Sequence, residues 1–151
     1  MKTKSLFDSN PAATRSRWMI VDDNRDILSL MPAVAAPLCD ADIECYQSPQ
    51  AALSAFQSAA GSFELIITDL EMPGMSGIEL GQRLHALAPE IKILLATGSE
   101  VITDAEAREK GFCGLLHKPF STGRLRHLLK SAGVGKISAD FPAGITALTP
   151  A

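Results

Sequence analysis

Five polar residues of this sequence carry side chains that can together hold a phosphoryl group. Three are carboxylates, one is a hydroxyl and one is an amine: Asp22, Asp23, Asp69, Thr97 and Lys118. Carboxylates that lie close together repel each other without a cation, and oxygen ligands combined with water and phosphate favour Mg²⁺. An amine and a hydroxyl beside such an ion can contact phosphoryl oxygens. The residue types therefore indicate a Mg²⁺-dependent phosphoryl site, provided that the fold brings them together.

The elements that must position these residues are short apolar runs separated by helical patterns. The runs are typical of buried strands and span residues 18–21, 43–46, 65–68, 91–96 and 115–117. The helical patterns span residues 24–38, 49–60, 77–87, 104–111 and 121–130. Pro32 lies inside the first helical pattern and predicts a kink or an early end there.

Strands that alternate with helices predict a parallel α/β sheet with helices on both faces. The five polar residues occur at or just after the ends of four of the predicted strands. Because the carboxyl ends of parallel strands share one edge of the sheet, these side chains are expected to converge. Each pair or residue alone also fits a turn or a helix cap. The phosphoryl interpretation therefore depends on the equivalent positions of the whole set.

Composition and charge exclude several other classes of protein. The chain has 151 residues, of which 46% are hydrophobic and 21% are charged, and its net charge of −3 gives no basic surface for nucleic acid. Its three cysteines lack metal-ligand or CxxC spacing, which is typical of reduced thiols. We see no signal peptide and no membrane-spanning run. We therefore expect a cytoplasmic protein without direct membrane or nucleic-acid contacts.

The domain organisation follows from where the periodic patterns begin and end. Residues 1–16 lack periodicity and are predicted to form a flexible N-terminal arm. Residues 17–131 form one predicted domain of ordinary size. Residues 132–151 are rich in Ala, Gly and Pro and are predicted to form a C-terminal tail. This division leaves no separate output domain.

Four motifs resemble the receiver domain of two-component response regulators, a family typified by CheY. They are IVDDN at 20–24, LIITDLEMPGMSGIEL at 65–80, LLATG at 94–98 and HKPF at 117–120. The motifs occur in the order of the family and close to its spacing, and the resemblance covers about residues 17–131. It implies a flavodoxin-like doubly wound (βα)5 fold, whose five-stranded parallel sheet has the order 2-1-3-4-5.

The resemblance also implies a role for each site residue. Asp69 matches the phosphoacceptor, while Asp22, Asp23, Asp69 and the backbone carbonyl of Glu71 match the groups that bind Mg²⁺. Thr97 matches the switch hydroxyl.

Lys118 matches the lysine that pairs with the phosphoryl group, and the resemblance implies a cis Lys118–Pro119 bond. Leu115 departs from the family, which usually has Tyr or Phe there as a rotating reporter. We therefore expect no Tyr–Thr style of coupling and an output change that is either smaller or differently routed. Glu71 and Ser99 are expected to flank the site.

The expected function is that of a phosphoacceptor rather than an enzyme, although the domain assists its own phosphorylation and dephosphorylation. A sensor histidine kinase or a histidine phosphotransfer protein is expected to supply the phosphoryl group. The modified domain then switches its contacts with a downstream protein target. A monomer or a weak homodimer is expected, and the sequence leaves open whether the chain belongs to a hybrid kinase.

Two alternatives remain open from the sequence. One is a pseudo-receiver, an interaction module of the same fold that is no longer phosphorylated. The other is a Mg²⁺-dependent phosphohydrolase of the haloacid dehalogenase type, with an aspartyl nucleophile. That class needs a second Asp two residues after the first as general acid, and here the position holds Glu71.

Overall fold

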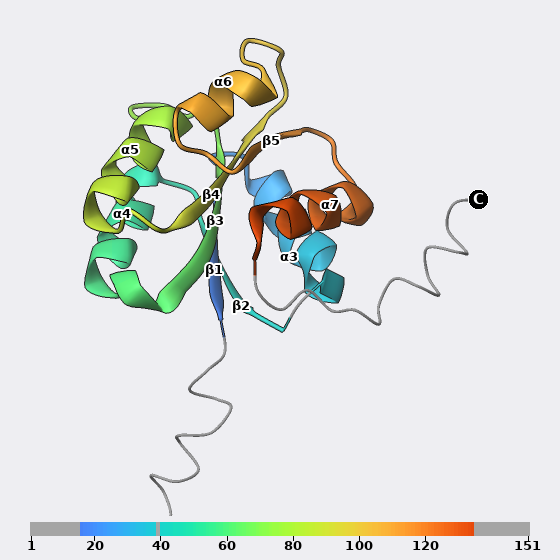
Figure 1. Cartoon of the computed structure of the whole chain (residues 1–151). Helices are drawn as coiled ribbons and strands as arrows, with labels where there is room; N and C mark the ends of the chain where they lie inside the picture. Colours follow the sequence, from blue (N-terminus) through green and yellow to red (C-terminus); the bar gives the residue numbers. More distant parts are fainter. Residues whose placement is uncertain (1–15, 39, 135–151) are drawn as a thin grey trace, which may run out of the picture.

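The fold is a central five-stranded parallel sheet covered by helices on both faces, as a computed structural model shows (Figure 1). The structure describes residues 16–38 and 40–134, so most of the predicted arm and tail lies outside the described residues. The strands are β1 Arg17–Val21, β2 Asp42–Tyr46, β3 Phe63–Asp69, β4 Lys92–Thr97 and β5 Gly114–His117. The α-helices are α3 Arg25–Ala35, α4 Pro49–Ser58, α5 Gly77–Leu87, α6 Asp104–Glu109 and α7 Thr122–Ala132.

The strand order is β2-β1-β3-β4-β5, and every neighbouring pair is parallel. This confirms the predicted flavodoxin-like α/β fold. Helices α4 and α5 cover one face of the sheet with α6, whereas α3 and α7 cover the other (Figure 1). Across the described residues, no helix combines the length and the apolar character needed to cross a bilayer.

Alternating side chains of the strands build the two halves of the core. On β1, Met19 belongs to the cluster on the α4–α5 side, whereas Trp18 and Ile20 belong to the cluster on the α3–α7 side. This alternation follows from the two-residue period of a strand, and both faces are apolar because both are covered by helices. Trp18 is fully buried, and its Nε1 donates to Oε1 of Glu64 at 3.2 Å.

Short polar side chains start four of the helices. Ser48, Ser76, Thr103 and Ser121 each accept a backbone N–H of the first helical turn. Such caps satisfy donors that have no partner inside the helix. They fix the point where each loop from the sheet turns into a helix.

The first helix differs from its predicted extent of 24–38. The α3 helix continues through Pro32 but ends at Ala35, and a 3₁₀ helix, η1 Ala36–Leu38, completes the segment. Pro37 lies in η1 and has no N–H to extend the α-helical bonding. Pro32 likewise cannot donate to the carbonyl of Leu28, and the thiol of Cys45 donates to that carbonyl at 3.8 Å. A bond from β2 therefore helps the helix to tolerate Pro32.

Candidate phosphoacceptor site

The candidate site lies at the carboxyl edge of the sheet, where β1 and β3 end side by side. Val21 and Thr68 are partners in the parallel register of these strands. The next residues along the chain are Asp22, directly after β1, and Asp69, the last residue of β3. They therefore come together. One carboxylate oxygen from each of Asp22, Asp23 and Asp69 lies within 4.8 Å of the other two.

The three carboxylates differ in their exposure to solvent. Asp22 is 3% exposed and Asp69 is 7% exposed, whereas Asp23 is an exposed residue. One oxygen of Asp22 accepts the backbone N–H of Asn24 at 2.9 Å, which holds the turn that follows β1. The carboxylates of Asp22 and Asp69 are thus buried, and that of Asp23 is open to solvent.

Lys118 supplies a positive charge to the two buried carboxylates. Its Nζ donates to Oδ2 of Asp22 and to Oδ1 of Asp69, each at 2.8 Å. The backbone N–H of Lys118 donates to the carbonyl of Thr97 at 2.8 Å, which ties the end of β5 to the end of β4. The Lys118–Pro119 peptide bond is cis, as the resemblance implies. Residues distant in the sequence thus form one ion-paired group.

The pKa of Asp69 and that of Lys118 are both raised. Burial is the largest influence on Asp69 and raises its pKa. The hydrogen bond from Lys118 lowers that pKa, and the negative charge of Asp22 raises it again, so the pKa remains above its usual value. Burial by itself lowers the pKa of Lys118, but the hydrogen bonds and charges of Asp22 and Asp69 outweigh it and raise that pKa. The site therefore has an excess of negative charge that one lysine does not offset.

The loop after Asp69 is held in place by a glycine and two backbone hydrogen bonds. A Cβ added at Gly77 would lie 2.1 Å from the carbonyl oxygen of Asp69, so only glycine fits there. The N–H of Leu70 donates to the carbonyl of Ala96, and the N–H of Gly77 donates to the carbonyl of Leu70, both at 2.8 Å. The start of α5 is thereby packed directly against the backbone of the candidate phosphoacceptor.

The hydroxyl of Thr97 is directed to Ser99 rather than to Asp69. Thr97 is fully buried, and its Oγ1 accepts the N–H of Ser99 at 3.0 Å and lies 3.2 Å from the hydroxyl of Ser99. The Ser99 hydroxyl donates to Oε2 of Glu71 at 3.3 Å. The sequence placed Glu71 and Ser99 beside the site, but it carried no signal for this connection between two loops.

The donor set fits Mg²⁺. Three carboxylates each place an oxygen within 4.8 Å of the others, all the donors are oxygens, and burial with mutual repulsion makes a bound cation favourable. Asp22, Asp23 and Asp69 are the side chains that would hold the ion. Glu71 lies two residues after Asp69, and its backbone carbonyl is a further candidate ligand.

The comparisons with known proteins agree with this geometry. A family model described as the response regulator receiver domain matches residues 18–130. The chain therefore belongs to the response-regulator receiver domain family of two-component signalling.

Individual relatives show the same domain in longer proteins. The transcriptional regulatory protein FixJ of Bradyrhizobium diazoefficiens is 32% identical over 123 residues, which are 79% of this chain and 57% of FixJ. The autoinducer 1 sensor kinase/phosphatase LuxN of Vibrio campbellii is 33% identical over 70 residues, which are 46% of this chain and 8% of LuxN. A crystal structure of FixJ-N superimposes with a TM-score of 0.66 at 29% identity, over 79% of this chain and 94% of that one. The chain thus spans only part of the length of these curated relatives.

Proposed function

We propose that this receiver domain accepts a phosphoryl group on Asp69 in a Mg²⁺-dependent reaction and thereby changes its contacts with another protein. The observation that carries the proposal is the ion-paired group at the sheet edge. A buried Asp69 carboxylate lies 2.8 Å from an ammonium and within 4.8 Å of two further carboxylates. An ion pair that serves only the fold needs one carboxylate for one lysine. Here three carboxylates surround one lysine, and this excess of negative charge suits a bound cation and a phosphoryl group.

In the proposed reaction, an oxygen of Asp69 attacks the phosphorus of a phosphohistidine on the partner. A P–O bond to Asp69 forms, the P–N bond breaks, and the histidine leaves with the electron pair. Lys118 stays beside the acceptor and stabilises charge on the phosphoryl oxygens, which is most of what a protein contributes to phosphoryl transfer. Bound Mg²⁺ would supply further charge compensation for these oxygens. The resulting acyl phosphate is the modified state.

The partner that supplies the phosphoryl group is a sensor histidine kinase or a histidine phosphotransfer protein. The similarity of LuxN, named as a sensor kinase/phosphatase, over part of the chain supports this assignment. The proposal places the protein in the cytoplasm, as a phosphoacceptor rather than an enzyme with turnover.

The two alternatives make different use of the same residues. In a phosphohydrolase, the carboxyl two residues after the nucleophile acts as general acid, but here that residue is Glu71 and its carboxylate accepts from Ser99. A pseudo-receiver needs no acidic group around Lys118. The retained carboxylates and their ion pairs favour the phosphorylated receiver over both.

The test is phosphorylation by acetyl phosphate, followed by measurement of the intact mass. The wild-type chain is expected to gain one phosphoryl group with Mg²⁺ and none with EDTA. Asp69→Asn is expected to gain none. Asp42→Asn is the matched control, because Asp42 is an exposed aspartate at the start of β2, and it should behave like the wild type. Failure of the wild type under conditions that label a known receiver would favour the pseudo-receiver.

A further inference from the structure

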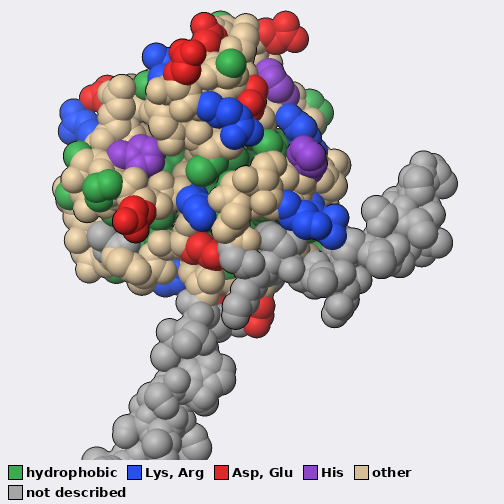
Figure 2. All heavy atoms as spheres, viewed as in Figure 1, with side chains coloured by type: hydrophobic (Ala, Val, Ile, Leu, Met, Phe, Trp, Pro, Cys, Tyr) green, Lys and Arg blue, Asp and Glu red, His purple; other side chains and the backbone are tan. Residues whose placement is uncertain are grey.

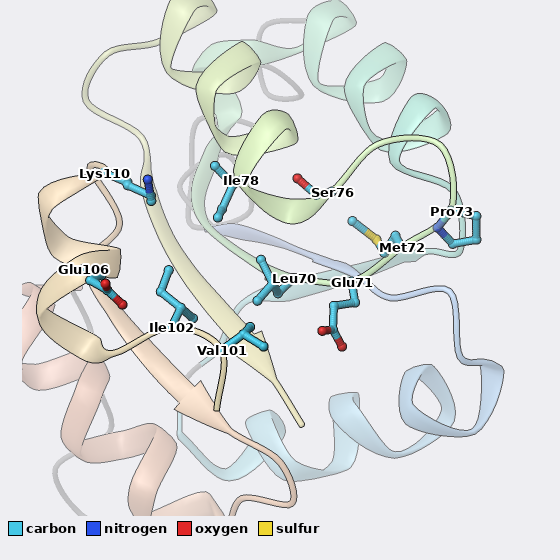
Figure 3. A pocket seen from close by; sticks show the side chains of 10 residues that line it. All are labelled: Leu70, Glu71, Met72, Pro73, Ser76, Ile78, Val101, Ile102, Glu106 and Lys110. Carbon is cyan, nitrogen blue, oxygen red and sulfur yellow. The ribbon is translucent and has the colours of Figure 1, made fainter. Parts of the chain in front are cut away.

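A groove beside the site lies between the loop after β3 and helix α6 (Figure 3). Its volume is about 670 Å³, within the range of ligand and side-chain binding sites. Leu70, Ile78 and Ile102 form apolar walls, and Val101 at the rim is 69% exposed. We call this cavity the α6 groove.

Glu71 connects the α6 groove to the phosphoacceptor. Its side chain lines the groove (Figure 3). Its carboxylate accepts the hydroxyl of Ser99, which in turn contacts the hydroxyl of Thr97. Asp69 lies opposite Ala96 in the register of β3 and β4, so Thr97 is the next residue at that edge. One hydrogen-bonded chain therefore runs from beside Asp69 to the wall of the groove.

Phosphorylation of Asp69 would act on both ends of this chain. An aspartyl phosphate adds close to two negative charges and new acceptor oxygens. The Thr97 hydroxyl can donate to these oxygens only if it turns away from Ser99. Loss of that contact weakens the Ser99–Glu71 hydrogen bond, and repulsion by the new charge moves the Glu71 carboxylate further from Asp69. The carboxylate is then free to pair with a partner in the groove.

The opposite direction, toward β5, offers no polar connection of this kind. Leu115 is opposite Leu95 on β4 and is fully buried in the apolar core. Its side chain has no polar atom that can follow the movement of the Thr97 hydroxyl. Among the described residues, the Ser99–Glu71 pair is therefore the side-chain hydrogen-bond route that leaves Thr97.

The chemistry of the groove indicates what it binds. Its walls accept apolar side chains, and its two carboxylates, Glu71 and Glu106, outnumber its one ammonium, Lys110, so the net charge of the lining favours a cation. Glu100, the residue before Val101, is also exposed on the loop before α6. In Figure 2, acidic side chains gather at the top of the view, where Figure 1 places α6.

We propose that the α6 groove is a phosphorylation-dependent docking site for a protein segment with apolar side chains and a Lys or Arg that pairs with Glu71. This inference rests on the proposed phosphorylation of Asp69. A segment of a protein fits better than a small free ligand because two of the apolar lining residues, Val101 and Pro73, are exposed, so the groove is open to the surface. Because coupling is reciprocal, a bound segment would also stabilise the modified state.

The test uses methyl NMR of the whole chain, with beryllofluoride and Mg²⁺ as the phosphoryl mimic. The probe is a short amphipathic peptide of Leu, Ala, Gln and Lys, and its control has Glu in place of Lys. The Lys peptide is expected to shift the methyl signals of Ile78, Val101 and Ile102 and to bind at least about fivefold more tightly with beryllofluoride than without. The Glu peptide is expected to bind weakly in both states.

Variants separate docking from coupling. Val101→Asp should abolish peptide binding in both states. Glu71→Gln should bring the affinity ratio between the two states close to one. Glu109→Gln, an exposed glutamate of α6 outside the groove lining, is the matched control and should keep the wild-type ratio. Fluorine NMR of each variant reports bound beryllofluoride.

The outcomes distinguish this inference from the function on which it rests. If the wild type binds beryllofluoride but its peptide affinity stays unchanged, or the shifts lie outside the groove, the docking proposal is wrong and the phosphoacceptor proposal stands. Equal ratios in wild type and Glu71→Gln would refute the role of Glu71. If the wild type binds no beryllofluoride, both proposals fail.

Discussion

Replacing Lys118 with methionine tests whether its ammonium holds two buried carboxylates. Its Nζ lies 2.8 Å from an oxygen of Asp22 and 2.8 Å from one of Asp69. At an effective dielectric constant near 20, each attraction is about 6 kcal/mol before desolvation, which offsets most of it. Removing one partner of a buried pair typically costs about 3–5 kcal/mol. We therefore expect Lys118→Met to lower the free energy of unfolding by about 3 kcal/mol in EDTA.

A double-mutant cycle with Asp69→Asn isolates this interaction. With the Asp69 charge removed, Lys118→Met leaves fewer unpaired carboxylates, so its cost should fall by about 1–2 kcal/mol. Urea unfolding of the four proteins measures the coupling. Lys92→Met is the matched control, because the Lys92 amine contacts only the Gly133 carbonyl among the partners identified, and it should cost less than about 1 kcal/mol.

Magnesium should restore part of the stability that Lys118→Met loses. A ligand that binds only the folded state at about 100 times its Kd stabilises it by about 2.7 kcal/mol. This gain should be present in Lys118→Met and much smaller once Asp69→Asn is added. An equal cost of Lys118→Met in both backgrounds, with no effect of Mg²⁺, would refute the electrostatic account of the site.

Three further predictions concern the same edge of the sheet. Gly77→Ala should destabilise the fold by about 2–3 kcal/mol in urea unfolding, because the added Cβ would lie 2.1 Å from the carbonyl oxygen of Asp69. Gly123→Ala is the control and should be neutral or stabilising, because the nearest atom to its Cβ would be 3.7 Å away. Equal effects of the two substitutions would contradict the close approach at Gly77. Burial and Asp22 raise the pKa of Asp69, so the stability it contributes is fully present below its unfolded-state pKa and is lost as pH rises through the raised value. The unfolding free energy of wild type minus that of Asp69→Asn should therefore fall from about pH 4 upwards, and a constant or rising difference would speak against it. Asp23→Asn should weaken Mg²⁺ binding at least tenfold in calorimetry, which is about 1.4 kcal/mol. The stability of the fold should change little, because Asp23 is exposed. An unchanged Mg²⁺ affinity would show that Asp23 is not a ligand.

The sequence predicts the fold because local patterns and global topology agree. Alternating apolar runs and helical patterns indicate the parallel sheet, and the helix starts predicted at residues 77 and 104 are those that the structure has. Strand ends are less well predicted. The third strand begins at Phe63, two residues before the predicted start, because pairing with β1 and burial of Phe63 extend it beyond the apolar run.

The convergence of the candidate site was predictable for a topological reason. Residues at the carboxyl ends of parallel strands must share an edge, so the meeting of Asp22, Asp69 and Lys118 follows once the strands are recognised. The strand order itself came from the resemblance, because periodicity alone does not distinguish the arrangements of a doubly wound sheet.

What the sequence could not give is the contact between side chains on different loops. The bond between Ser99 and Glu71 joins residues 28 positions apart, and no spacing rule relates them. The α6 groove likewise depends on how the loop after β3 and helix α6 pack together. The carbonyl of Leu28, which Pro32 leaves without a helical donor, instead accepts a thiol from β2, and no local pattern predicts that contact.

The central claim is that the carboxylate of Asp69 is the atom group that receives the phosphoryl group. Reductive trapping tests it most directly: the chain is incubated with acetyl phosphate and Mg²⁺, treated with borohydride, digested and mapped by peptide mass spectrometry. An acyl phosphate on Asp69 should be reduced to homoserine at position 69, and EDTA should prevent the change. Homoserine or phosphate at any other position, or an unmodified Asp69 in a protein that has gained phosphate, would contradict the account.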